Sequence, residues 1–248
     1  MRKLSPFKAI AHAFNSIRNY PQVAFRIGRV WVPVMLVAGF LDAYAGPPDT
    51  QSQDMTGREW IQVLTGVLSL IAVCSMAVNW HRFILRDELG PSLRLDSAVF
   101  RYAGNTVLIM MAMLVPAVMV LAAVMLLPPA GAIIGLPLVV LSGGVVTRLS
   151  IKLPAVALGN GTFSFRDAWT ASEGNFWPCA GVFLLNAAIF LGILLVLTLA
   201  VAMLNAVSLP LSLAFQVVAA ALLQLFYAIF NASIFTSLYG FFVERRDF

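Results

Sequence analysis

Residues able to take part in acid–base or metal chemistry are few in this sequence of 248 residues. His12 and His81 are the two histidines, and they are the side chains expected to titrate near neutral pH. Cys74 and Cys179 stand in or beside apolar segments, without the spacing of a zinc site or a disulfide framework. No Gly-rich loop precedes a helix in the manner of a phosphate-binding loop. We therefore expect no catalytic site, cofactor or metal, and a protein that is not an enzyme.

Cationic side chains at the ends of apolar segments are the strongest candidates for a binding role. His81, Arg82 and Arg86 end one apolar run, and Arg148 and Lys152 lie one helical turn apart at the end of another. A guanidinium can bind a phosphate through two hydrogen bonds, so this basic rim is predicted to bind anionic lipid, with Arg82 and Arg148 as principal contacts. The alternative is that each of these groups only anchors its own helix at the membrane surface.

A stripe of polar side chains is predicted on the last apolar segment. Its members fall within about 80° of one another on a helix: Gln216, Gln224, Tyr227 and Asn231. Inside a membrane such groups should face protein or water. Hydrogen bonding between helices is one interpretation of this stripe, and the lining of a permeation path is the other.

The segments that must position these residues are strongly apolar. Hydrophobic residues make up 60% of the chain and charged residues 11%, a composition unlike that of soluble domains. Asp, Glu, Lys and Arg are missing from Trp60–Trp80, Tyr102–Thr147 and Gly174–Val243. About 20 apolar residues cross a bilayer, so each of these stretches can hold one or two spans.

The sequence predicts an all-α, polytopic membrane helical bundle with six transmembrane helices in a single integral membrane domain, residues 1–248. The first span runs from about Ile27 to Ala45 and the second from Trp60 to about Leu85. Turns at Pro128–Gly131 and Ser208–Pro210 divide the two later apolar stretches into spans three and four, and five and six.

Charge sets the predicted orientation. Under this topology, 15 of the 16 lysines and arginines lie on one side and Arg58 lies on the other. Positive loops stay in the cytoplasm, so both termini are predicted to be cytoplasmic in a bacterial inner membrane. Ala43-Tyr44-Ala45 resembles a signal-peptide cleavage site, but the stretch before the first apolar run is long for a signal peptide.

Three similar segments precede the three predicted pairs of spans: Ser5–Ser16, Arg94–Asn105 and Ser164–Asn175. Each is predicted to form a short cytoplasmic helix in the membrane interface, and Gly104 and Gly174 suit the ends of the second and third helices. Cytoplasmic loops with helical turns are the alternative for the second and third copies. The protein is thus predicted to contain three helix-span-span repeats, at about residues 5–88, 94–157 and 164–248.

Two parts of the chain resemble a broad group of bacterial membrane proteins. Phe163–Trp177 following Arg148–Pro154 is similar to the repeated element of this group, which includes YciC-like inner-membrane proteins. Trp80–Arg82 followed by Leu85 and Asp87-Glu88 is similar to sequences in uncharacterised members of the group. The Phe163–Trp177 element is also similar to the membrane domain attached to some glycerophosphodiester phosphodiesterases. No segment has the length or the charges of the soluble phosphodiesterase barrel. The resemblance covers nearly the whole chain and implies a fold and a location, but no activity.

The expected function is that of a non-enzymatic inner-membrane protein of the bacterial envelope that interacts with lipids or protein partners. Membrane lipids, anionic lipids included, are the expected partners, with a homo-oligomer as a further option and nucleic acid excluded. The alternative is a small transporter or channel. Ion-coupled carriers keep ionisable residues within their spans, and the middles of predicted spans two to six hold no acidic or basic group.

Overall fold

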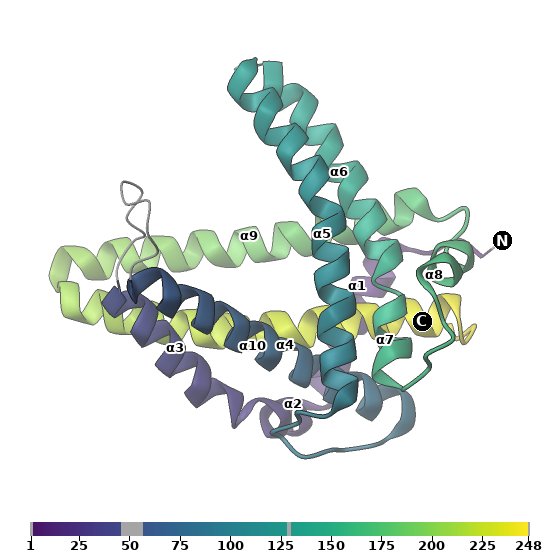
Figure 1. The fold of residues 1–248 in the computed structure, drawn as a ribbon, viewed down its shortest axis with the longest axis horizontal. Helices are drawn as coiled ribbons and strands as arrows, with labels where there is room; N and C mark the ends of the chain where they lie inside the picture. Colours follow the sequence, from purple (N-terminus) through teal and green to yellow (C-terminus); the bar gives the residue numbers. More distant parts are fainter. Residues whose placement is uncertain (1, 46–56, 128–129, 248) are drawn as a thin grey trace.

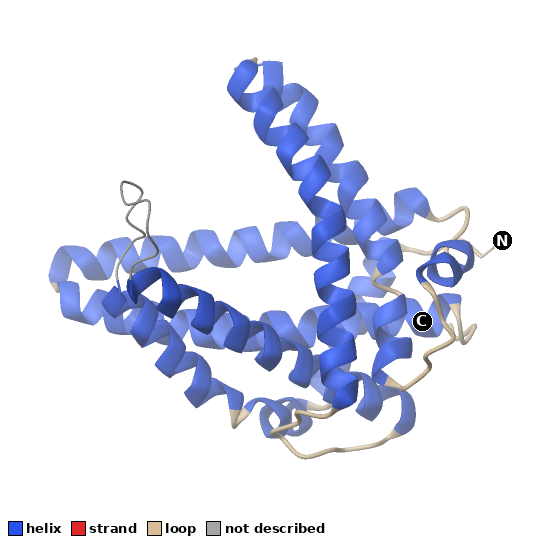
Figure 2. Cartoon of the chain, in the orientation of Figure 1, coloured by secondary structure: helices blue, strands red, loops and turns tan. Residues whose placement is uncertain are grey.

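The computed structural model describes residues 2–45, 57–127 and 130–247, and within these ranges the chain is helical except for turns and loops (Figure 2). The helices, in chain order, are α1 (Pro6–Asn19), α2 (Pro21–Gly28), α3 (Trp31–Ala45), α4 (Gly57–Arg86), α5 (Ser97–Leu126), α6 (Ala130–Leu149), α7 (Lys152–Ala157), α8 (Phe165–Ala171), α9 (Phe176–Val207) and α10 (Leu209–Phe242).

Among the described residues, five helical segments are long and apolar enough to cross a membrane: α4, α5, α6 continued by α7, α9 and α10. Helices α2 and α3 together form a sixth candidate, bent by 53° between them. At this bend Gly28 lies so close to the side chain of Leu225 that a Cβ atom would not fit without movement. The multi-pass helical architecture is therefore confirmed at the level of five or six candidate spans.

The predicted connections agree with the helix boundaries. Helix α10 begins after Ser208, whose hydroxyl accepts a hydrogen bond from the amide of Leu211, and Pro210 occupies the first turn. The predicted turn at Pro128-Pro129 lies outside the described residues, but α5 ends just before it and α6 begins just after it. Helices α3 and α4, α5 and α6, and α9 and α10 pack as neighbouring pairs.

Side-chain caps define two of the short helices. Ser5 accepts a hydrogen bond from the Lys8 amide and is followed by Pro6 at the start of α1. Ser164 and Asp167 form a reciprocal capping box at the start of α8, with bonds of 3.2 and 2.7 Å. Gly174 has a φ of +72°, the left-handed conformation predicted for it.

The second predicted short helix is wrong as a separate element. Residues 97–105 are the first turns of the long helix α5, and Gly104 lies inside that helix. Asp96 caps α5 by accepting hydrogen bonds from the amides of Ala98 and Val99, and its hydrogen bond with Arg94 lowers the pKa of the Asp96 carboxyl. A glycine costs a helix about 1 kcal/mol, which a helix of 30 residues tolerates. The threefold repeat is not confirmed by this arrangement.

The α5–α6 hairpin and the other long helices extend in different directions from one packed end of the molecule (Figure 1). The α5–α6 hairpin projects away from α3, α4, α9 and α10, while α1, α7, α8 and both termini gather near the junction. Burial follows this shape, because the buried residues of α5 lie between Ala98 and Ile109, whereas Leu126 at its far end is 78% exposed. Apolar surface this extensive needs a lipid environment.

Candidate functional site

A buried polar contact joins three helices. His81 of α4 is 0% exposed, its Nδ1 lies 2.7 Å from Thr236 Oγ1 of α10, and its Nε2 lies 3.1 Å from the hydroxyl of Tyr102 in α5. The Thr236 hydroxyl donates its proton to the carbonyl of Ala232. Nδ1–H of His81 therefore donates to Thr236, and Nε2 accepts from Tyr102, so the neutral ring is fully satisfied. This burial corrects the prediction that His81 contacts lipid.

Two predicted rim arginines bind the ends of short helices. Arg82 Nε donates to the carbonyl of Ala157, the last residue of α7, at 2.8 Å, and its Nη1 lies 3.2 Å from a Glu88 oxygen. Carbonyls at a helix C-terminus lack partners within the helix and attract a cation. Arg82 therefore attaches the end of α4 to the end of α7.

Arg148 makes the equivalent contact with α8. Its guanidinium donates to Ser172 Oγ at 2.8 Å and to the Trp169 carbonyl at 2.5 Å, and it stacks 3.6 Å from the centre of the Trp169 ring. Arg148 is 5% exposed. The two guanidinium groups are thus committed to different protein partners, which favours anchoring over a lipid site shared by Arg82 and Arg148.

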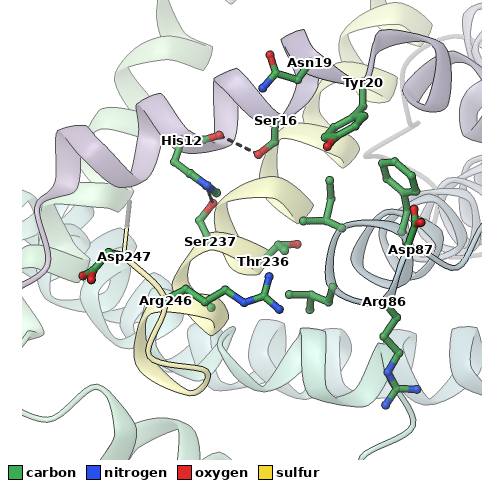
Figure 3. A pocket seen from close by; sticks show the side chains of 14 residues that line it. His12, Ser16, Asn19, Tyr20, Arg86, Asp87, Thr236, Ser237, Arg246 and Asp247 are labelled. Atoms are coloured by element: carbon green, nitrogen blue, oxygen red, sulfur yellow. Dashed lines mark hydrogen bonds between the residues drawn. The ribbon is translucent and has the colours of Figure 1, made fainter.

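Arg86, by contrast, is exposed and lines a polar cavity of about 720 Å³ between α1, the end of α4 and the end of α10 (Figure 3). His12 of α1 contacts Ser237 at 2.8 Å, and burial lowers the pKa of His12, which favours its neutral form. Charges of both signs line the cavity, since Arg86 and Arg246 are accompanied by Asp87 and Asp247. The cavity suits polar groups but selects neither sign of charge.

The predicted polar stripe divides between two environments. Asn231 accepts a hydrogen bond from Asn186 of α9 at 3.1 Å and donates to the carbonyl of Tyr227, so it does bond between helices. Gln216 is exposed, and neither Gln216 nor Gln224 has a hydrogen-bond partner in the described part of the chain. The expectation of bonding between helices therefore holds for Asn231 and not for these two glutamines.

Three members of the stripe border a second cavity, of about 370 Å³, within the spans: Gln224, Tyr227 and Asn231. The rest of its lining is largely apolar and comes from α4, α5, α10 and the region where α6 passes into α7, with Val73, Ile109 and Ala228 among the side chains. The cavity lies beside the His81 contact, because Tyr102 also lines it. It is a largely apolar space, with polar side chains of α10 and the hydroxyl groups of Ser69, Thr106 and Ser150 in its lining.

The polar contacts that hold the loop between α4 and α5 were not predicted from the sequence. Ser75 donates to the carbonyl of Arg94 at 2.8 Å, and Asn79 donates to the carbonyl of Pro91 at 3.0 Å. Trp31 of α3 donates to the carbonyl of Ser92 at 3.1 Å. The four-residue spacing of Ser75 and Asn79 in an apolar helix is a signal that could have indicated a polar face.

No family model, curated protein or solved structure matched the chain. The resemblance to YciC-like proteins and to phosphodiesterase membrane domains therefore stays a prediction from the residues quoted above.

The contacts of Arg148 predict that replacing it lowers the free energy of unfolding more than replacing an exposed cation does. In the Arg148→Gln variant, the bonds to α8 and the stacking on Trp169 are lost, and we expect the free energy of unfolding to fall by about 2 to 3 kcal/mol. Arg166→Gln is the matched control, because Arg166 is exposed on α8, and we expect a change below about 0.5 kcal/mol. Reversible unfolding in mixed micelles measures both, and equal losses would contradict the assigned role of Arg148.

Proposed function

We propose that this chain is a non-enzymatic protein of the bacterial inner membrane that binds membrane lipid, with six spans and both termini in the cytoplasm. Its three span pairs are proposed to be related units, in which the first turns of α5 take the place that α1 and α8 hold in the other two. The apolar helices support the membrane location, and the distribution of cations supports the orientation.

The ends of the helices at the junction carry the positive charge. Arg82 at the end of α4 belongs to the α3–α4 hairpin, and Arg101 near the start of α5 and Arg148 at the end of α6 belong to the α5–α6 hairpin. Helices α7 and α8 contact this end of the bundle. Cytoplasmic loops are the positively charged ones in inner-membrane proteins. This convergence supports a cytoplasmic position for the junction.

The cavity of about 370 Å³ between the spans carries the lipid-binding proposal. Its volume falls within the range of roughly 300 to 1,000 Å³ that small-molecule sites occupy. The largely apolar lining matches an acyl chain, whereas a path for hydrated ions or polar solutes needs polar groups along its length. Gln224, Tyr227 and Asn231 supply hydrogen-bonding groups beside the apolar space, as a lipid with a polar ester region would need.

Filling the cavity tests the proposal. Ala228 is buried and lines the cavity, so the larger side chain of Ala228→Phe should exclude part of an acyl chain. If two methylene groups of the lipid lose their buried position, binding weakens by about 1.6 kcal/mol. The amount of co-purified lipid should then fall roughly tenfold. Ala220→Phe on the exposed side of α10 is the matched control and should retain the lipid of the wild type. Native mass spectrometry reports bound lipid in both variants.

Unchanged lipid occupancy in a folded Ala228→Phe variant would contradict the cavity as a lipid site. A solute flux into liposomes that the wild type shows and Ala228→Phe blocks would support the transporter alternative instead.

Reporter fusions test the orientation. Fusions after Gly90 and Gly161, which lie in loops at the junction, should report the cytoplasm, and a fusion after Ser208 at the far end of the α9–α10 hairpin should report the outside. A reversal of this pattern would overturn the proposed topology.

A further inference from the structure

A small pocket of about 140 Å³ lies between the first turns of α5 and the loop that follows α7. Helix α5 supplies Arg101 and Asn105, and helix α7 supplies Lys152 and Val156. The remaining lining comes from the loop after α7: Gly159, Asn160, Gly161 and Phe163. None of the described residues that line this pocket is acidic. Two cations therefore share a small space without a carboxylate among its walls.

The charged groups of Arg101 and Lys152 make few contacts with the rest of the protein. Arg101 Nε donates to the carbonyl of Ser97 at 3.2 Å, while its two terminal amines have no hydrogen-bond partner among the described residues. The ammonium of Lys152 lies 4.0 Å from the centre of the Phe165 ring and makes no hydrogen bond or ion pair in the described part of the chain. Charged donors in this state favour an anionic ligand.

Other arginines in the bundle show what a structural role looks like. Arg82 pairs with Glu88, Arg94 pairs with Asp96, and Arg246 pairs with Glu244. Arg148 donates to two acceptors of α8 and its neighbouring turn. Arg101 and Lys152 differ from these arginines because both line one pocket that has no carboxylate in its lining.

The backbone around the pocket holds it open. Gly159, with a φ of +79°, ends α7, and the amide of Asn160 bonds to the carbonyl of Ala155 at 2.9 Å, which turns the loop back towards α5. The Asn160 side-chain oxygen accepts from Thr162, which fixes the loop and leaves the amide group of Asn160 free to donate. No atom lies within 4 Å of the position that a Cβ of Gly161 would occupy, so this edge of the pocket is open.

We propose that Arg101 and Lys152 bind a phosphate group in this pocket. A single water needs roughly 10 to 15 Å³ of such space, so 140 Å³ holds a tetrahedral anion together with some of its waters. The guanidinium supplies two parallel donors and the ammonium a compact charge, the combination that phosphate recognition uses. This inference goes beyond the acyl-chain cavity and does not depend on it.

The phosphate can belong to a lipid headgroup or to a soluble phosphate compound, and the probes separate the two. Phosphatidic acid mixed with phosphatidylcholine in nanodiscs tests the lipid, and inorganic phosphate titrated into the same full chain in detergent tests the soluble ligand. Native mass spectrometry measures the retained lipid, and calorimetry measures phosphate binding. Loss of lipid selectivity alone in the variants identifies a headgroup, whereas loss of phosphate binding identifies a soluble ligand.

The variants are Arg101→Gln, Lys152→Gln and their combination, with Arg166→Gln as a control that removes one exposed cation at the same end of the molecule. We expect each pocket variant to weaken phosphate binding about tenfold and the combination to abolish selectivity. Arg166→Gln should behave as the wild type.

A further variant separates a loss of binding from a loss of folding. Gly161→Glu places a carboxylate at the open edge of the pocket without removing a native contact, so it should abolish phosphate binding while the midpoint of thermal unfolding stays unchanged. The proposal is overturned if the wild type prefers neither phosphatidic acid nor phosphate, or if folded Arg101→Gln, Lys152→Gln and Gly161→Glu variants bind as Arg166→Gln does.

Discussion

Hydrogen bonds from one buried imidazole join helices that belong to three different hairpins. His81 in α4 bonds to Tyr102 in α5 and to Thr236 in α10, and the proton positions leave no polar atom of the ring unsatisfied. In an apolar interior each of these groups would cost free energy if its partner moved away, so the contact specifies which faces of the three helices meet. The α5–α6 hairpin diverges from the other long helices beyond this junction (Figure 1).

The cations near this junction fall into two groups, those that bind helix ends and those that line a pocket. With the spans held together, Arg82 and Arg148 lie where they can bind the C-terminal carbonyls of α7 and α8, so these charges stabilise the protein itself. Arg101 and Lys152 lie at the same end of the bundle but face a pocket that lacks a carboxylate. The apolar cavity between the spans and the basic pocket are separate spaces, because they have no lining residue in common.

Local chemistry in the sequence predicts the elements of this fold better than it predicts their contacts. The capping box of Ser164 and Asp167, the left-handed Gly174 and the turn at Ser208 follow from residue type and spacing, and each is confirmed. The continuity of α5 through Gly104 does not follow, because a glycine is compatible with a helix end or a helix interior. The sequence around His81 fits a membrane-surface belt as well as a buried contact, and the partner that decides between them, Thr236, lies 155 positions away.

A double-mutant cycle on His81→Leu and Tyr102→Phe tests the junction most directly. Each single variant and the combination are unfolded reversibly in mixed micelles, and the coupling free energy is taken from the four values. If the His81–Tyr102 hydrogen bond joins the two helices, a favourable coupling of about 1 kcal/mol is expected, in the upper part of the range for hydrogen bonds between membrane helices. Additive effects, with a coupling below about 0.3 kcal/mol, would show that His81 and Tyr102 do not hold α4 and α5 together.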